Sequence, residues 1–341
     1  MINESLRVRL KMNHSFFKCP VLRDLPEPPS GRQGWPWDQE PEPPESGHKA
    51  WPKISIIIPS FNQGQYIEET IRSILLQGYP RLELHVIDGG STDNTVEIIR
   101  KYEPWLSSWV SEKDSGQSEA INKGFGRCSG EIFNWICSDD LLTQGALEMI
   151  AETFLRNPEA DVVSGACIFQ YDNGPQENEV KLVERENWLA VPYSAAIWQP
   201  SCFFRRSLIL RKQIVREDLH YCMDRELWTY LCEGNSRWEW CDHPLSIYRF
   251  TGENKSVVGG QKIIDELDRI YREYVKEVVP LPFLLRKVWL PLVLTNACHS
   301  SLLIRFASLR ASRAVALVLL ALYPSVRVRA LQREFHGYSI N

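Results

Sequence analysis

The stretch KISIIIPSFNQGQYIEETIRSIL, from Lys53 to Leu75, decides the fold of this 341-residue chain. It begins with a short apolar run, passes through a polar turn and continues with apolar residues spaced as on one face of a helix. The same order returns around VIDGGSTDNTVEIIRKY (Val86–Tyr102), EKDSGQSEAINKG (Glu112–Gly124) and WICSDDLL (Trp135–Leu142). Continuous apolar strands alternating with helices predict an α/β fold, with a parallel sheet covered on both faces.

The polar turns follow the carboxyl ends of their strands, where open α/β sheets bind ligands. The last turn contains adjacent carboxylates, Asp139 and Asp140, which repel each other unless a cation or hydrogen-bond donors stabilise them. Mn²⁺ and Mg²⁺ prefer hard oxygen ligands and usually keep substrate phosphate oxygens in their shell. The pattern favours a nucleotide at the strand ends, with a divalent cation on its phosphates. The alternative is that the pair forms an ordinary helix N-cap.

Composition narrows the class of protein. Apolar residues make up 44% and charged residues 24% of the chain, as in ordinary soluble proteins, and the net charge of −4 gives no reason to expect nucleic acid as a partner. Nine scattered cysteines without CxxC spacing indicate reduced thiols rather than a zinc site. The polar N-terminus has no apolar signal segment. We therefore expect a cytoplasmic protein.

The sequence divides into three regions. Residues 1–50 are rich in proline and charge and are expected to be extended, with Trp35 and Trp37 docking on the body. Residues 51–257 form the main domain, with a ligand-binding half at 51–171 and a second half at 172–257.

The third region, residues 258–341, is predicted to be a helical extension that is both apolar and basic. From Leu281 onward it contains eight basic residues and one acidic residue, a pattern that favours an anionic membrane surface. Its longest uncharged run, Val288–Ile304, is marginal for spanning a bilayer. We expect helices lying in the interface on the inner face of the membrane. Packing on the main domain and a true span are the alternatives.

The first turn lacks the glycine-rich pattern of a dinucleotide fingerprint. Its hydroxyl, aromatic ring and amide are suited to a base and ribose, and the alternative is a simple capping turn. These candidates are Pro59, Ser60, Phe61 and Asn62.

Six more residues are candidates from the next turns. Asp88 ends a strand, where a carboxylate can accept a hydrogen bond from a pyrimidine N–H, whereas capping is the favoured role for Asp93. Side chains near the start of the next predicted helix could contact a diphosphate or a base. For the lysine among them, a solvated surface position is the alternative. They are Asp114, Gln117, Asn122 and Lys123.

Asp224, in HYCMDRELW, lies among aromatic and apolar neighbours just before a predicted helix. A carboxylate there is suited to act as a general base. On spacing alone, helix N-capping is favoured.

The segments PSFNQGQYIEETIRSIL, VIDGGSTDNTVEII, DSGQSEAINKGF and GEIFNWICSDD, in this order and spacing, resemble glycosyltransferase family 2. The resemblance covers about Ile54 to Ser256 and points to the inverting, bacterial polysaccharide-type members. It implies the GT-A fold, a Rossmann-like, mostly parallel sheet with helices on both faces. It also implies a nucleotide-diphosphate sugar donor and a glycan or lipid-linked acceptor.

The resemblance implies roles for single residues. Pro59, Ser60, Phe61 and Asp88 line the nucleoside pocket, with Asp114 and Asn122 nearby; Asp139 and Asp140 form the metal-binding motif, with Asp140 as the direct ligand of Mn²⁺ or Mg²⁺; and Asp224 is the catalytic base. The implied reaction is a single displacement with inversion, in which the base takes a proton from the attacking hydroxyl.

Three positions depart from the family's pattern. Ser138 replaces the first acid of D-x-D, Gly89 replaces an aspartate that reads the base, and Thr251 stands where many relatives have histidine. These departures leave two rival hypotheses: a non-catalytic scaffold that binds nucleotide-sugar or glycan, and a nucleotidyltransferase. Release of nucleoside diphosphate rather than pyrophosphate separates the leading hypothesis from the second rival.

Overall fold

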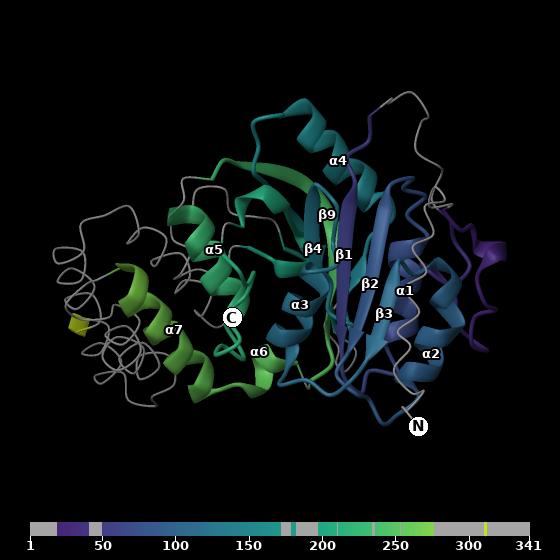
Figure 1. Cartoon of the computed structure of the whole chain (residues 1–341), viewed down its shortest axis with the longest axis horizontal. Helices are drawn as coiled ribbons and strands as arrows, with labels where there is room; N and C mark the ends of the chain where they lie inside the picture. Colours follow the sequence, from purple (N-terminus) through teal and green to yellow (C-terminus); the bar gives the residue numbers. More distant parts are fainter. Residues whose placement is uncertain are drawn as a thin grey trace, which may run out of the picture.

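The computed structural model describes residues 19–40, 50–171, 179–181, 197–209, 211–233, 236–252, 254–275 and 310–311. Within these residues, nine strands form one sheet with helices on both faces (Figure 1). The strands are β1 Ile54–Ser60, β2 Leu82–Asp88, β3 Ser108–Ser111, β4 Ile132–Trp135, β5 Leu141–Leu142, β6 Val162–Tyr171, β7 Glu179–Lys181, β8 Cys202–Arg205 and β9 Trp238–Phe250. The helices are α1 Ile67–Leu75, α2 Thr95–Tyr102, α3 Gln117–Phe125, α4 Ala146–Arg156, α5 Met223–Glu233, α6 Lys255–Val258 and α7 Gln261–Val275.

The first four long strands confirm the predicted alternation. They lie in the order β3-β2-β1-β4, and every neighbouring pair among them is parallel (Figure 1). β1 and β2 are buried along their whole length, which explains the apolar run of β1, whereas β2 also buries the polar side chains of Glu83 and His85. Their carboxyl ends meet at one edge, and the polar turns that follow them lie together there.

Beyond β4 the sheet is mixed. β8 runs antiparallel to both β4 and β6, and β9 runs parallel to β6 and antiparallel to β5. β6 is one continuous strand of ten residues.

Side chains of β1 alternate between two cores. Ile56 faces a core that includes residues of α1, α2 and α4, whereas Ile57 faces a second core that includes residues of α3, α5 and α7. This alternation is the period-two pattern of a strand buried on both faces. The strands are therefore held by a core on each face of the sheet, and this fixes the positions of the turns that follow them.

The described part of the N-terminal region, residues 19–40, packs on α1. Arg72 of α1 is fully buried and donates hydrogen bonds to the backbone carbonyls of Pro26, Pro36 and Trp37. Trp37 is itself buried beneath this guanidinium, and the indole N–H of Trp35 donates to a carbonyl of β5. Both tryptophans therefore contact the body, as expected from the sequence.

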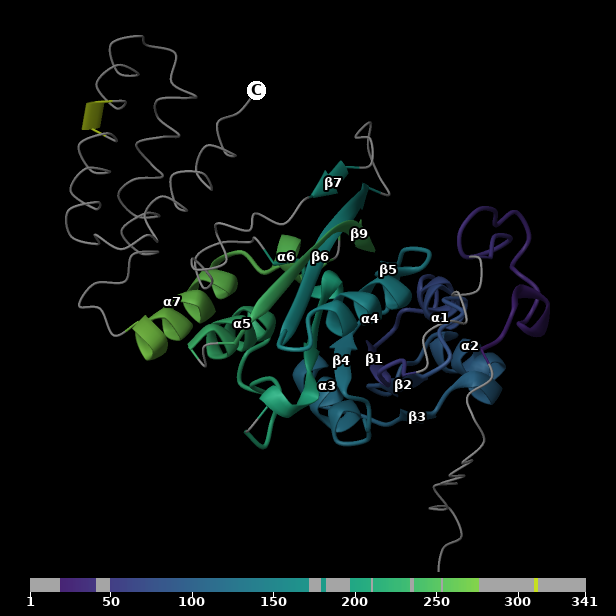
Figure 2. The ribbon, with the colours of Figure 1, turned by 90° about the horizontal axis from the view of Figure 1, so that it is seen from above.

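α7 lies beside α5 at one end of the molecule (Figures 1 and 2). Its Ile270 is fully buried in the core that also contains Leu227 and Trp228 of α5. Among the described helices, none is long and apolar enough to cross a membrane. The predicted interfacial helices after Leu281 lie almost entirely outside the described residues.

Candidate active site

The turn after β1 combines one anchored residue with two groups open to a ligand. Asn62 adopts a left-handed conformation (φ 52°), and its side chain accepts a hydrogen bond from the Thr92 N–H (2.9 Å). Phe61 is 58% exposed, an unusual position for a phenyl ring. The buried Ser60 hydroxyl, which follows Pro59, has no hydrogen-bond partner among the described residues. A ring and a hydroxyl are thus available for binding at this strand end.

Asp88, at the end of β2, is buried, and its own turn uses its carboxylate. Oδ2 accepts hydrogen bonds from the N–H groups of Gly90 and Ser91 and from the Ser111 hydroxyl, and Oδ1 accepts one from the Ser91 hydroxyl. Asp88 therefore shapes the turn.

Asp114 fills the space left by Gly89. A Cβ added to Gly89 would lie 2.9 Å from both carboxylate oxygens of Asp114, so a larger side chain does not fit there without moving Asp114. Burial is the main cause of the raised pKa of Asp114, and the carboxylates of Glu119 and Asp88 also raise it. The Asp114 carboxylate, from the β3–α3 connection, therefore lies directly against Gly89.

Asp93 and Asn122 hold the backbone. Asp93 accepts hydrogen bonds from the N–H of Gly64 (2.9 Å) and from the N–H and hydroxyl of Thr95; although its partial burial acts in the opposite direction, these bonds lower its pKa. Asp93 therefore holds the turn directly before α2, whose N-cap position is Asn94. The Asn122 amide bonds the Ile214 and Val215 N–H groups, the Val215 carbonyl and Glu217, so all its donors and acceptors serve loop 214–217. The structure thus gives Asn122 a structural role in place of the expected nucleotide contact.

Lys123 and Gln117, two further predicted site residues, have different surroundings. The Lys123 ammonium pairs with Glu112 (3.0 Å) and Glu119 (2.7 Å), so it is a surface ion pair in this structure. The Gln117 amide donates to the Cys137 thiol (3.2 Å), directly beside the carboxylate pair.

The turn after β4 brings together a half-buried Asp139 and a buried Asp140 in a firmly held position. The Thr70 hydroxyl of α1 lies 2.8 Å from the carbonyls of both Ser138 and Asp140. Asp140 is 2% exposed and accepts a hydrogen bond from the Arg249 N–H (3.3 Å), and the Asn254 amide donates to Asp139 (3.2 Å). The backbone of the turn is therefore fixed before any ligand binds.

Burial raises the pKa of Asp139 and raises that of Asp140 well above its ordinary value, and for Asp140 the neighbouring Asp139 charge adds to the effect. One ligand atom each from Cys137, Asp139 and Asp140 lies within 4.8 Å of the others. Two adjacent carboxylates with so few donors fit a hard divalent cation, because such an ion would offset both their desolvation and their repulsion. The carboxylates are the fitting ligands, since a soft thiol is a poor ligand for Mn²⁺ or Mg²⁺.

Asp224 faces the same region from α5, where it lies in the first helical turn. Burial raises its pKa, and its Oδ1 accepts a hydrogen bond from the Arg225 N–H (2.7 Å). Burial raises the pKa of Cys137 well above its ordinary value, with further contributions from Asp140, Asp139 and, more weakly, Asp224. The charges of the carboxylate pair and of Asp224 therefore reach the same thiol.

The sequence analysis missed Lys255 and Asn254, which follow β9. The Lys255 side chain is solvent-exposed, yet the surrounding protein lowers the pKa of its ammonium, while Cys137, Glu266 and Asp114 act in the opposite direction. The ammonium is thus within electrostatic reach of the site. Only the polar run after the last strand signals these residues in the sequence, and its pairing with Asp139 depends on β9, which was not predicted.

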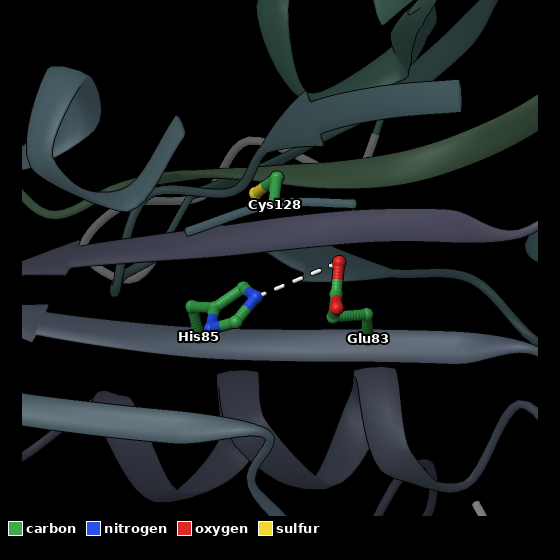
Figure 3. A group of neighbouring side chains, drawn as sticks. All are labelled: Glu83, His85 and Cys128. Carbon is green, nitrogen blue, oxygen red and sulfur yellow. Dashed lines mark ion pairs between the residues drawn. The ribbon is translucent and has the colours of Figure 1, made fainter. Parts of the chain in front are cut away.

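A second cluster lies near the opposite ends of the strands. Figure 3 shows Glu83 and His85, from one strand, pointing toward one another near Cys128, with 3.6 Å between the carboxylate and the imidazole. The Glu83 carboxylate already accepts hydrogen bonds from Lys53, Ser55 and Ser129, and a cation would have to compete with the Lys53 ammonium. This network is sufficient to explain the cluster as a structural anchor.

Comparisons with known proteins agree with the geometry. One relative is the "GalNAc(5)-diNAcBac-PP-undecaprenol beta-1,3-glucosyltransferase" of Campylobacter jejuni. Its sequence is 25% identical to this one over an alignment that covers 66% of this chain and 72% of the relative. Glycosyltransferase GlyG from Streptococcus pneumoniae is 31% identical over 35% of this chain and 40% of its own. The matched stretches span about half or less of the length of several other curated relatives.

Two solved structures share the fold. TarS from S. aureus, in complex with UDP-GlcNAc, has a TM-score of 0.55 and 18% identity over 84% of this chain and 91% of its own. A mannosyltransferase from Pyrobaculum calidifontis, in complex with GDP-Man and Mn²⁺, has a TM-score of 0.52 and 20% identity over 90% of this chain and 84% of its own. The fold is therefore that of the GT-A glycosyltransferases. The model of "Glycosyl transferase family 2" matches residues 55–223, and the chain belongs to this family.

Proposed function

We propose that this protein transfers a sugar, with inversion, from a nucleoside-diphosphate donor to a hydroxyl of a glycan or lipid-linked acceptor in cell-surface polysaccharide synthesis. One observation carries the proposal. The carboxylates of Asp139 and Asp140 lie close together in the turn after β4, and their charges, together with that of Asp224, reach the Cys137 thiol of the same turn.

Asp139 and Asp140 are the proposed ligands of Mn²⁺ or Mg²⁺. When bound, such a cation stabilises the negative charge that develops on a departing diphosphate. Lys255 is proposed to add a second positive charge near the same phosphates, because its ammonium lies within electrostatic reach of Cys137 and Asp114. Lys255 lies four residues after Thr251, the position at which many relatives have histidine.

The nucleoside is proposed to lie between the turns after β1 and β3. The exposed Phe61 ring offers a stacking face, the unpartnered Ser60 hydroxyl a hydrogen bond, and the Asp114 carboxylate an acceptor. A carboxylate favours bases with a ring N–H, namely uracil, thymine and guanine, over cytosine and adenine. Asp88 and Asp93 are proposed to support this pocket through the turns they hold.

Asp224 is the proposed base. Its burial keeps a carboxylate among apolar neighbours, where its basicity is greater than in water. It would accept the proton of the acceptor hydroxyl as that oxygen attacks the anomeric carbon. The bond to the diphosphate oxygen breaks in the same step, and the configuration of that carbon inverts.

The acceptor class is proposed from two sources. The name of the Campylobacter relative specifies an undecaprenol-linked substrate, and the C-terminal region of this chain is basic and apolar. Both are consistent with work at the inner face of the cell membrane.

The test is donor turnover by the purified full-length protein with a bacterial lipid extract as acceptor. We expect Mn²⁺- or Mg²⁺-dependent release of nucleoside diphosphate from a UDP- or GDP-sugar, together with a product of inverted anomeric configuration. Release of pyrophosphate would contradict the proposal. So would metal-dependent nucleotide binding without transfer to any acceptor.

A further inference from the structure

The backbone directly before Asp224 is bound by one carboxylate from α7. Glu266 accepts hydrogen bonds from three consecutive N–H groups: His220 at 2.7 Å on Oε1, and Tyr221 at 2.8 Å and Cys222 at 2.9 Å on Oε2. Hydrogen bonds to an ionised acceptor are stronger than neutral ones, and three of them on one segment restrict its position. The last of these residues is two positions before Asp224.

The same segment is held from its other side as well. The Lys255 ammonium donates to the His220 carbonyl (3.2 Å), and the Ser118 hydroxyl of α3 donates to the Leu219 carbonyl (2.8 Å). Carbonyls and N–H groups of residues 219–222 are thus bound by different elements. α5 begins immediately after this segment, so its first turn inherits the position that these contacts set.

The position of α7, and with it that of Glu266, is fixed by polar contacts with three further residues between positions 216 and 226. Arg269 donates to the Asp218 carbonyl (2.7 Å), Glu273 pairs with Arg216, and Tyr274 donates to Glu226 of α5. Figure 2 shows α7 running along α5 on this side of the molecule.

We propose that Glu266 is a positioning residue for the transfer reaction: by binding the N–H groups of residues 220–222 it sets the place of the Asp224 carboxylate relative to the acceptor hydroxyl. This inference rests on the proposed role of Asp224 as the base. Glu266 itself does not touch the reacting atoms.

The charge of Glu266 provides a second readout. The charged and titratable groups that face Asp224 are Arg225 on α5, Glu266 on α7, and the thiols of Cys137, Cys202 and Cys222. Among the charged groups, Arg225 lowers and Glu266 raises the pKa of Asp224. A neutral residue at 266 therefore lowers that pKa, and the acidic limb of the kcat/KM profile moves to lower pH.

The experiment compares Glu266→Gln, Glu266→Asp and Glu273→Gln in the full-length protein. The assay follows release of nucleoside diphosphate from whichever of UDP-glucose, UDP-N-acetylglucosamine or GDP-mannose the unmodified protein turns over with Mn²⁺ and a bacterial lipid extract. Glu266→Gln places an amide donor against a backbone N–H, and we expect kcat to fall by roughly 10- to 100-fold with the donor KM unchanged, because misplacement by about 1 Å costs about 100-fold. Its acidic limb should move to lower pH.

The other two variants separate charge, position and general stability. Glu266→Asp keeps the charge with a shorter reach, so it should lose kcat without moving the acidic limb; it also serves if Glu266→Gln does not fold. Glu273→Gln removes an ion pair of the same helix and should retain kcat and the pH profile. Amide hydrogen exchange should become faster at residues 220–222 only in the two Glu266 variants.

The outcomes distinguish this inference from the function on which it rests. Full activity of Asp224→Asn, or no donor turnover by the unmodified protein, contradicts the proposed function. An inactive Asp224→Asn beside Glu266 variants with unchanged kcat contradicts only the role of Glu266. A loss of donor binding in the Glu266 variants would also overturn that role, since it indicates general damage.

Discussion

Asp224 carries the proton transfer in the proposed reaction, and its burial sets the pH range in which it acts. A base works only when it is deprotonated, and burial raises the pKa of Asp224 from the ordinary value of 3.8. Activity should therefore be full above the raised pKa and fall as pH decreases through it. We expect the acidic limb of kcat/KM to lie above 3.8.

The matching variant is Asp224→Asn, which keeps the shape of the side chain and removes the base. We expect kcat to fall by roughly 10²- to 10⁴-fold, the usual contribution of a general base, with nucleotide binding unchanged. Steady-state kinetics over a pH series measures both effects. If residual activity in the variant keeps the same acidic limb, the limb belongs to another group.

At the scale of residues, the sequence predicted well which side chains lie in the turns at the strand ends. It predicted less well which of them keep polar atoms available for a ligand. Asp88, Asp93 and Asn122 lie in the predicted turns, yet neighbouring backbone and side-chain groups use their polar atoms. Sequence spacing gives the type and location of a donor or acceptor. It does not give the partners, because those of Asn122 lie more than ninety residues further along the chain.

At the scale of elements, the close approach of α3 to β1 depends on Gly124. A Cβ at this position would lie 2.7–2.8 Å from side-chain atoms of Ile57 in the middle of β1. α3 also supplies Gln117 and Ser118 to the site region, so its distance from the sheet matters for both stability and function.

Gly124→Ala should lower the free energy of unfolding by about 1–3 kcal/mol, the usual cost of overpacking a well-packed core. Gly126→Ala is the matched control, because a Cβ there meets only ordinary contacts at 3.6 and 3.7 Å. Chemical denaturation of both variants measures the difference. Equal stability of the two would show that α3 adjusts without cost.

The elements that were predicted and those that were missed differ in their patterns. β1 is a nearly continuous apolar run, β2 is an apolar stretch interrupted by Glu83 and His85, and both were predicted. β9 carries Trp238, charged residues and Pro244, and its pairing with β6 shifts register around Ala166, which sits opposite that proline. Such irregular pairing has no local periodicity, since proline within a sheet is tolerated at bulges and edges.

At the scale of the whole molecule, charges connect the N-terminal region to the cation site. The Arg249 guanidinium lies 2.9 Å from Glu69 of α1 and its backbone N–H contacts Asp140, while Glu69 also lies 3.9 Å from Arg32 of the N-terminal region. Residues 19–40, α1, β9 and the turn after β4 are therefore physically linked around the carboxylate pair. Composition alone did not predict this connection, because it depends on how distant segments pack.

The most direct test of the account is Mn²⁺-dependent binding of UDP and GDP, measured by calorimetry on the full-length protein, Asp140→Asn and Ser138→Ala. We predict that Asp140→Asn weakens metal-dependent binding by more than roughly 10-fold, since it removes a proposed ligand of the cation. Ser138→Ala should bind like the unmodified protein, because its contact with Thr70 is made by its backbone carbonyl. Unchanged metal-dependent binding by Asp140→Asn would contradict the central claim that this carboxylate pair holds the cation.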